Sequence, residues 1–451
     1  MKNVITMCVL FAVCSAQAVK FERVLVRQQW PWGAKVNIDY VLADAEGKSW
    51  DVEVVLRAGG ETLSVPKSSF SGDRYGVSAG AHRIVWDPSK TDYASRDTLG
   101  DVTVTLSAKD VEDSRYLIID MSHGAQNWAR PAIWPVSYTN EIVDSDGDGR
   151  WDREFKLTKM AFRRIDPGSF IMGAPSSEIR TYSYTAAEYQ HEVTITEPFY
   201  MAVFELTSQQ FYQIWAWRIN NTYGKSESTG ARPANNLSYD YIRGSAANGI
   251  DWPTTGTKVY DVESVETFVN INGYTANTIS TLGWFRRHVP GLLVDLPTEA
   301  QWEYCCRAGT STPFNNGTTL TNANAVCDGL SAVGRYKFNS FAYDSSTGSW
   351  TDPKDDSQLV YGTAEVGSLA PNAWGLYDMH GNEAEWVRDW MCDKTTAPET
   401  DPQGSATGTK RCFRGGCWSW GPSECRSASV SGDAPNKAYS TIGCRFMIPM
   451  P

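Results

Sequence analysis

A change in hydrophobic pattern divides this chain into two regions that need different folds. Over residues 21–112, apolar and polar residues alternate in short runs, most clearly at residues 36–40 and 102–106, with turn-forming Gly, Asp and Ser between the runs. A period of two is typical of strands that bury one face. We therefore predict a β-sandwich of the immunoglobulin or fibronectin kind over residues 20–118. His82 is the one histidine of this region, which also lacks a cysteine or carboxylate cluster, so we interpret it as a structural or adhesive spacer.

The first 18 residues have the order of a secretory signal. A basic start at Lys2 leads into an apolar run over residues 4–13, and a stretch of small residues ends at Ala18. The run is too short to span a bilayer. A buried N-terminal helix is the alternative to a secretory signal. A lipid anchor on Cys14 would want a small residue before it, which the chain does not have. We expect a secreted, periplasmic or extracellular protein with no transmembrane segment after the leader.

Residues 119–158 are interpreted as a linker, because the alternation fades and prolines interrupt it. Within this segment, Asp144, Asp146 and Asp148 follow the Asp-x-Asp-x-Asp-Gly order of a calcium loop. In such a loop alternate carboxylates converge on a hard cation, and the glycine permits a sharp turn. Phe155 stands at the twelfth position, where a bidentate Glu is wanted. A solvated acidic turn is the alternative.

Cysteines are concentrated in the second domain, which we assign to residues 159–451. Two cysteines lie in the leader, and the other eight all lie in this domain: Cys305, Cys306, Cys327, Cys392, Cys412, Cys417, Cys425 and Cys444. An even number in an exported chain predicts disulfides, although sequence does not choose among the pairings. None of the spacings is the CxxC pattern of a zinc site.

The charge of the chain excludes one class of partner. The formal net charge is -11 and no basic stretch occurs, whereas proteins that bind nucleic acid gather Lys and Arg on one face. The chain also holds 18 Trp. Exposed rings would suit a glycan or protein ligand, and packing in the core is the alternative for most of them. We expect an unknown protein or glycan as partner and no nucleic acid.

Four groups of motifs follow one another in the second domain. They are PGSFIMG (167–173) with HEVT (191–194) and FYMAVFELT (199–207), then LPTEAQWEY (296–304), then NAWGLYDMHGNEAEW (372–386), and finally RGGCW (414–418) with RSA (426–428) and IGCRF (442–446). In this order they resemble the formylglycine-generating enzyme, or sulfatase-modifying factor, family. The resemblance implies an irregular α+β domain that is related to the C-type lectin fold and steadied by calcium.

The second motif also predicts a helix from its own residues. Pro297 suits the opening of a helix, and Thr298 can cap its first turn. Gln301 stands three residues later, where a capping box needs its second partner. Trp302 is then expected to face the core or the site.

The third motif carries two carboxylates on either side of a glycine turn. Side-chain oxygens of Asp378 and Glu385, with carbonyls between them, can surround one hard cation. The resemblance assigns calcium to these two side chains and to the carbonyls of Gly381 and Glu383. A hydrogen-bonded turn with surface carboxylates is the alternative. A second calcium site of the family would begin near Asn324.

The fourth motif decides between catalysis and binding. Formylglycine formation oxidises a substrate cysteine with molecular oxygen, and the family uses two cysteines that hold copper(I), a soft ion that prefers thiolates. The resemblance places this pair at Trp420 and Cys425, so the first thiolate is missing. Cys417 stands where the family usually has Ser. A disulfide between Cys417 and Cys425, a displaced copper pair and two unpaired core residues are the three interpretations, and we prefer the disulfide in an exported chain.

Two functions follow from these interpretations. The first is a non-catalytic exported relative that binds a ligand in a cleft lined by Trp418, Trp420 and Arg426. The alternative is a copper-dependent oxidase that uses Cys425 and Cys417 to convert a sulfatase cysteine to formylglycine, with copper as cofactor and a sulfatase as partner. A sulfoxide synthase would also need iron held by histidines, and no two of the 5 histidines are near each other in sequence. Calcium is expected in either case.

Overall fold

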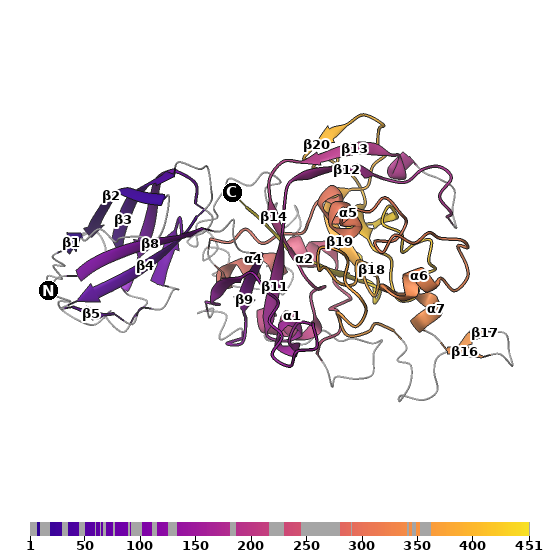
Figure 1. Cartoon of the computed structure of the whole chain (residues 1–451), viewed down its shortest axis with the longest axis horizontal. Coiled ribbons are helices and arrows are strands. Elements are labelled where there is room, and N and C mark those ends of the chain that lie inside the picture. The colour runs from indigo at the N-terminus through magenta and orange to yellow at the C-terminus, as the bar shows by residue number, and fades with distance from the viewer. Residues whose placement is uncertain are drawn as a thin grey trace.

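The computed structural model describes residues 7–9, 19–28, 35–44, 50–58, 60–63, 65, 69–74, 77–88, 91, 102–110, 115–124, 133–180, 186–215, 230–244, 280–289, 291–340, 342–344, 349–351 and 362–450. Figure 1 shows the N-terminal strands, in indigo, at one end of the molecule and the magenta to yellow elements of the C-terminal region gathered at the other. Within these residues no helix has the length and apolar character that a membrane crossing needs.

Two four-stranded sheets form the N-terminal region. The first has the order β1 (Met7–Val9), β8 (Val102–Asp110), β4 (Trp50–Ala58) and β5 (Glu61–Thr62). The second has the order β2 (Val19–Gln28), β3 (Val36–Asp44), β7 (Gly80–Trp86) and β6 (Phe70–Gly72). Neighbouring strands are antiparallel except β1 and β8. β1 lies within the segment expected to be a leader, whose removal stays a prediction.

The burial of these strands follows the alternation of the sequence. In β3, Val36, Ile38 and Tyr40 are buried, while the residues between them keep part of their exposure. β8 buries Val102 and Val104 in the same way. Residues of both sheets belong to one hydrophobic cluster, and each such side chain contributes roughly 1.5–3 kcal/mol when fully buried. The strands predicted from the alternation are confirmed, and the two sheets share a core.

A five-stranded antiparallel sheet begins the C-terminal region. Its order is β10 (Val136–Thr139), β9 (Tyr116–Asp120), β11 (Lys159–Ile165), β14 (Phe199–Ala202) and β24 (Met447–Pro449). The interpretation of residues 119–158 as a linker is therefore wrong for β10 and the end of β9. The physical reason is that β9 reads Tyr-Leu-Ile-Ile-Asp and buries its first four side chains, which requires a sheet covered on both faces.

The remaining strands form smaller sheets around this one. They are β22 (Val430–Asp433), β21 (Arg411–Arg414), β19 (Ala384–Trp390) and β23 (Ile442–Cys444) in one sheet, β12 (Gly168–Met172), β13 (His191–Ile195) and β20 (Glu399–Thr400) in another, and the pairs β15 (Gly334–Arg335) with β18 (His380–Gly381) and β16 (Ala342–Asp344) with β17 (Ser349–Thr351). The short helical segments are η3 (Arg153–Lys156), η4 (Ala186–Glu188), α6 (Asp328–Ser331) and α7 (Lys337–Ser340).

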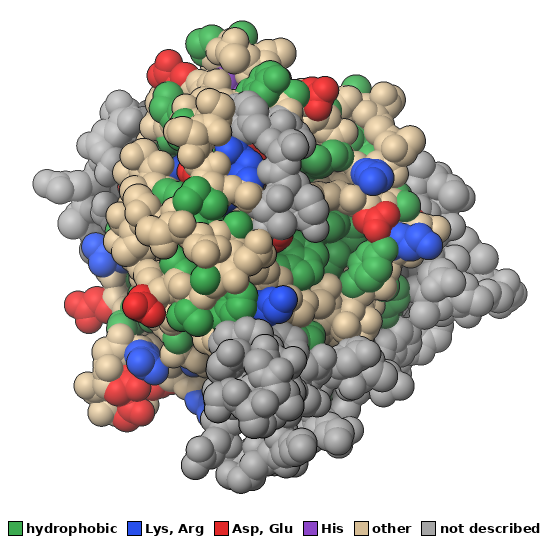
Figure 2. All heavy atoms as spheres, turned by 90° about the vertical axis from the view of Figure 1, so that its right-hand side faces the viewer, with side chains coloured by type: hydrophobic (Ala, Val, Ile, Leu, Met, Phe, Trp, Pro, Cys, Tyr) green, Lys and Arg blue, Asp and Glu red, His purple; other side chains and the backbone are tan. Residues whose placement is uncertain are grey.

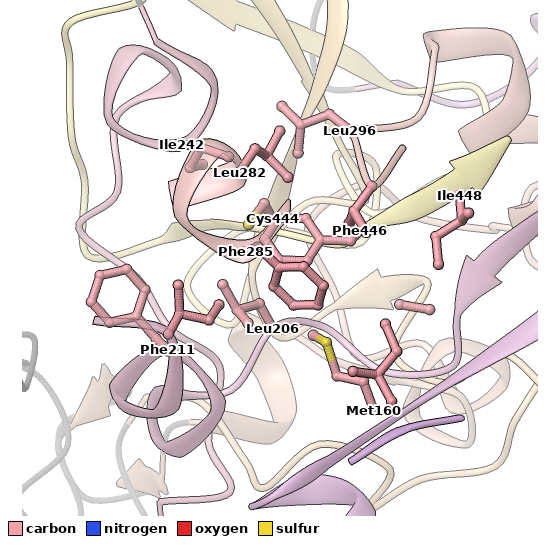
Figure 3. Close-up of a cluster of buried hydrophobic side chains, with 14 of the residues drawn as sticks. Met160, Leu206, Phe211, Ile242, Leu282, Phe285, Leu296, Cys444, Phe446 and Ile448 are labelled. Atoms are coloured by element: carbon pink, nitrogen blue, oxygen red, sulfur yellow. The ribbon is translucent and has the colours of Figure 1, made fainter. Parts of the chain in front are cut away.

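Three helices cover one face of the five-stranded sheet: α1 (Ser208–Trp215), α2 (Tyr239–Arg243) and α4 (Thr281–His288). Their apolar residues and those of β9, β11, β14 and β24 form the largest buried cluster among the described residues. Figure 3 shows Phe285 of α4 beside Phe446, with ring centroids 5.5 Å apart. This core fixes the strands and turns that carry the motifs.

Helix α5 (Glu299–Arg307) begins as predicted from the second motif. Thr298 Oγ1 accepts a hydrogen bond from Gln301 N at 3.1 Å, and Gln301 Oε1 accepts one from Thr298 N at 2.9 Å, which closes the capping box. Trp302 is fully buried, and its Nε1 donates to Glu385 Oε2 at 2.6 Å. The helix is thereby joined to the third motif.

Candidate functional site

The turn after β21 carries the two cysteines of the fourth motif into the interior. Cys417 and Cys425 are fully buried, and Gly416 passes so close that a side chain there would meet Cys425 Sγ at 2.6 Å. Cys417 Sγ lies 3.2 Å from Ser419 Oγ. Burial raises the pKa of Cys417 to about 12 and raises the pKa of Cys425 well above its usual value. Both sulfurs are therefore neutral thiols.

All eight cysteines of the C-terminal region lie among the described residues, and each carries a free thiol. The disulfides expected from the even count are thus not formed in this structure. The preferred pair of Cys417 and Cys425 is not formed either, and the Cys417 sulfur lies beside the hydroxyl of Ser419. Oxidation of this pair after export stays a prediction.

The site does not fit copper(I) held by two thiolates. Trp420 stands in place of the first thiolate, and its half-buried ring packs on the core with its centroid 6.0 Å from that of Phe413. The nearest cation in sequence, Arg426, directs Nη2 to both oxygens of Glu188 at 3.1 Å. Without a neighbouring cation a buried thiol such as that of Cys425 stays protonated, whereas a soft metal binds the thiolate.

The cleft expected from Trp418, Trp420 and Arg426 is wrong for two of its three residues. Trp418 is 4% exposed and Arg426 is 2% exposed, so neither faces a ligand. Arg426 pairs with Glu178 and Glu188, because a guanidinium taken out of water needs carboxylates around it. Trp420 alone keeps part of its ring at the surface.

Protein groups engage both oxygens of Glu385 in the third motif. Arg445 places Nε 3.1 Å from each oxygen and Nη2 2.8 Å from Oε1, while Trp302 Nε1 donates to Oε2. Arg445 is held in turn by the carbonyl of Ala202 at 3.0 Å. A cation beside Glu385 would face this guanidinium at close range. The arrangement therefore does not fit a calcium ion shared by Asp378 and Glu385.

Two more carboxyl groups lie close to this ion pair. Asp378 Oδ2 accepts from Gly367 N at 2.6 Å, and Glu205 accepts from Glu383 N at 2.9 Å and from Asn382 Nδ2 at 2.6 Å. Burial raises the pKa of Asp378 to about 6. Burial, with the neighbouring charge of Asp378, raises the pKa of Glu205 well above its usual value. Burial thus favours the neutral form of both carboxyl groups.

The two residues expected as carbonyl ligands make hydrogen bonds to other parts of the domain. Gly381 has φ 78°, and its N–H donates to Gly415 O at 2.7 Å. A side chain at Gly381 would meet Arg335 O at 2.0 Å, so only glycine fits this close approach. Glu383 is buried, accepts from Asn235 Nδ2 at 2.9 Å, and has its pKa raised by burial.

His380 joins the third motif to the fourth. Its Nδ1 donates to Cys425 O at 2.7 Å, and its Nε2 accepts from Asn315 N at 3.0 Å. A ring that donates through one nitrogen and accepts through the other is neutral, and burial lowers the pKa of His380 to about 4. Both nitrogens are used by the backbone, so His380 positions the turn and offers no free base.

Sequence reasoning missed Glu205 and Arg445. Both stand inside motifs, Glu205 in FYMAVFELT and Arg445 in IGCRF, but nothing local gives them a role. Each of the two has apolar neighbours in the sequence, which predicts that it is buried. Because buried charges are paired, these two residues could have been expected to form or join an ion pair.

Carboxylates do converge in the acidic loop before β11. Asp144, Asp146 and Asp152 each place a ligand atom within 4.8 Å of the others, and this is the one group of three or more His, Cys, Asp or Glu of that kind in the described part of the chain. Asp152 stands in this group in place of Asp148, which was predicted and whose Oδ1 accepts from Arg150 N at 2.8 Å. Oxygen donors of this type fit calcium.

Backbone amides hold the acidic loop in shape. Asp144 Oδ2 accepts from Gly149 N at 2.8 Å and its Oδ1 from Gly147 N at 2.7 Å, and these bonds lower the pKa of Asp144. Phe155, at the twelfth position, is 2% exposed and packs against Trp151 with ring centroids 4.7 Å apart. Phe155 thus anchors the acidic loop to the domain. Asn324, which was expected at a second calcium site, lies in a different, exposed loop before α6.

A family model described as "Sulfatase-modifying factor enzyme 1-like domain" matches residues 152–449. The formylglycine-generating enzyme of Bos taurus is 32% identical over 157 residues, which are 33% of this chain and 37% of that protein. The formylglycine-generating enzyme of Streptomyces coelicolor is 33% identical over 155 residues, which are 33% of this chain and 45% of that protein. The matched part therefore spans less than half the length of these relatives.

Two solved structures resemble the chain more weakly. The Treponema denticola variable protein 1 gives a TM-score of 0.43 at 21% identity and covers 64% of this chain and 95% of its own. PvdO from Pseudomonas aeruginosa gives a TM-score of 0.45 at 21% identity and covers 64% of this chain and 94% of its own.

Proposed function

Since the chain belongs to the sulfatase-modifying factor family, we propose that its C-terminal domain binds a ligand and does not oxidise cysteine. One observation carries this proposal: the position of the first copper thiolate is Trp420, whose ring is fixed against the core at Phe413. A ring held there occupies volume that a substrate thiol would need. The family uses copper and calcium, and the copper function requires two thiolates.

The state of the remaining cysteines supports the same conclusion. Cys425 is buried, and burial raises its pKa, so it would lose a proton only at a cost to the fold. Cys417 has the same property, with a pKa of about 12. A thiol of this kind neither binds copper(I) well nor attacks a substrate.

The finer parts of the proposal concern fold, location and ligand. We propose a C-type lectin-like C-terminal domain and an immunoglobulin- or fibronectin-like N-terminal sandwich that serves as a spacer in a secreted, periplasmic or extracellular protein. The ligand is a protein or a glycan, and a sulfatase is one candidate. Calcium is proposed for the acidic loop of Asp144, Asp146 and Asp152, whose oxygens already converge.

A copper-dependent oxidase that converts a sulfatase cysteine to formylglycine is the second candidate. The observation in its favour is that Cys417 and Cys425 lie in one turn, next to each other across Gly416. Relatives named as formylglycine-generating enzymes match a third of the chain.

A mass-spectrometric assay separates the two functions. The full chain, incubated with copper and oxygen, would be given a peptide that carries a sulfatase cysteine motif, and conversion of the thiol to an aldehyde would be followed. We expect no conversion above a protein-free control. Conversion that is lost in Cys425→Ser but kept in Cys327→Ser, a matched change at another buried cysteine, would establish the oxidase instead.

A further inference from the structure

The edges of the two N-terminal sheets differ in their protection against pairing with another chain. Two of these edges are short, because β5 has 2 residues and β6 has 3. The edge strand β2 is long, but a bulge interrupts its register with β3 between Phe21 and Arg23. It also carries charged residues, at Lys20, Glu22, Arg23 and Arg27. Short length, charges and bulges all keep sheets from joining edge to edge, so these three edges are protected.

The fourth edge is protected only by β1. Met7–Val9 of β1 pair in parallel with Val102–Val104 of β8, on the side of β8 that does not face β4. On that side no other strand of the described residues lies beside Thr105–Ser107. Because β1 belongs to the segment that we propose to be a leader, cleavage of the leader removes it. The edge of β8 is then open over residues 102–107, and β1 shows that a strand fits beside its first residues.

The opened edge has none of the protective features of the other three. Over residues 102–107, β8 reads Val-Thr-Val-Thr-Leu-Ser, without a charged residue or a proline, and its register with β4 is continuous. Val and Thr are β-branched and favour an extended strand. An uncharged edge of this kind is a template for another strand. Its side chains alternate between a buried apolar set and a half-buried hydroxyl set, which are Val102, Val104 and Leu106, and Thr103, Thr105 and Ser107.

The same edge is complementary to itself. If two copies of β8 run antiparallel with Thr105 opposite Thr105, the hydroxyl side chain of Thr103 stands opposite that of Ser107 in the second copy. Val104 then stands opposite Leu106 on the core face. Hydroxyl groups meet hydroxyl groups and apolar side chains meet apolar ones, which are favourable cross-strand pairs. A two-fold axis would set like charges against each other on a charged strand such as β2, and this stretch of β8 has no charge.

We propose that two copies of the mature chain dimerise by antiparallel pairing of their β8 strands about Thr105. Each copy then contributes backbone N–H and C=O groups that water would otherwise hydrate, and one sheet continues across the dimer. The inference rests on the proposed export and removal of the leader. It goes beyond the proposed function, because the N-terminal sandwich becomes a dimerisation domain and each dimer presents two ligand-binding domains.

The position of this edge suits contact between two copies. Figure 1 shows β1, which pairs with the start of β8, at the end of the molecule away from the C-terminal elements. The opposite end faces the viewer in Figure 2 and carries acidic and basic side chains among hydrophobic ones. The net charge of -11 makes two copies repel each other at close range. Pairing at β8 keeps the two C-terminal regions apart, and salt screens exposed charges that are separated by more than about 10 Å.

The test follows the chain after export with its own leader, by intact mass and by sedimentation velocity. We expect a mass without residues 1–18 and a dimer that dissociates on dilution. Thr105→Lys should raise the dissociation constant of this dimer about tenfold or more, because two ammonium groups meet at the axis. Thr62→Lys, the same change on the exposed edge strand β5, is the matched control and should leave the constant unchanged.

A cysteine cross-link tests the register without adding a charge. Thr105→Cys should form a disulfide between two copies under mild oxidation, because the two positions face each other across the axis. Thr62→Cys should form none. The cross-link decides the outcome if Thr105→Lys also lowers the melting midpoint of the chain.

Other outcomes would overturn the inference. They are an exported chain that keeps residues 1–18, a monomer at every concentration, a dimer that Thr105→Lys leaves unchanged, and equal cross-linking of the two cysteine variants. Binding of a different protein at β8 without self-association would assign the edge to that partner instead. None of these results depends on the formylglycine assay, so failure of the dimer and failure of the proposed function remain distinguishable.

Discussion

Two sites in the C-terminal region both gather carboxyl groups, but the charge of these groups is balanced in different ways. Around Glu385 the carboxyl groups are buried, and Arg445 supplies the positive charge from within the chain. In the loop of Asp144 and Asp152 the carboxylates stay near solvent and accept hydrogen bonds from backbone and hydroxyl donors. The difference indicates that converging carboxylates suit a metal ion where no arginine or lysine of the protein balances their charge.

The strongest way to break this comparison is to remove the internal cation. Arg445→Met should destabilise the protein by about 3–5 kcal/mol, because Glu385 is left buried without its partner. Urea unfolding followed by circular dichroism measures the loss. Arg153→Met is the control, since Arg153 pairs with Glu365 at the surface and such pairs are worth up to about 1 kcal/mol. A loss for Arg445→Met as small as that of the control would show that Glu385 does not need the guanidinium.

The second prediction separates the two sites by calcium. Calcium at about 100 times its dissociation constant should stabilise the folded chain by about 2.7 kcal/mol, and a chelator should reverse this. The rise in melting midpoint should disappear in Asp152→Asn, because this residue belongs to the converging group, and should persist in Asp378→Asn. The reverse dependence would restore calcium to the third motif.

The smallest expected effect is a pH dependence of the buried site. The pKa of Asp378 is about 6 in the folded chain against 3.8 for a free Asp, so the folded state holds the proton more tightly. The contribution of Asp378 to stability is therefore full below about pH 4 and is lost as the pH rises through 6. Between pH 4 and 7 the wild type should lose about 2 kcal/mol relative to Asp378→Asn in urea unfolding. Parallel curves for the two proteins would contradict the raised pKa of Asp378.

Features set by neighbours along the chain could be predicted well. The capping box of Thr298 and Gln301 needs residues only three positions apart, and the burial in β3 follows from alternation alone. The linker was mispredicted because β9 finds its partner β11 about forty residues later, and sequence patterns do not show which strands pair.

The candidate site divides in the same way. The sequence by itself determined the family, the absence of a thiolate at Trp420 and the acidic order around Asp144, because these depend on residue identity at fixed spacing. Only the tertiary structure decided that Arg445 neutralises Glu385 and that Arg426 forms an ion pair with Glu188. The physical reason is that desolvation and charge pairing depend on which atoms meet in space, and a pair 238 residues apart leaves no local trace in the sequence.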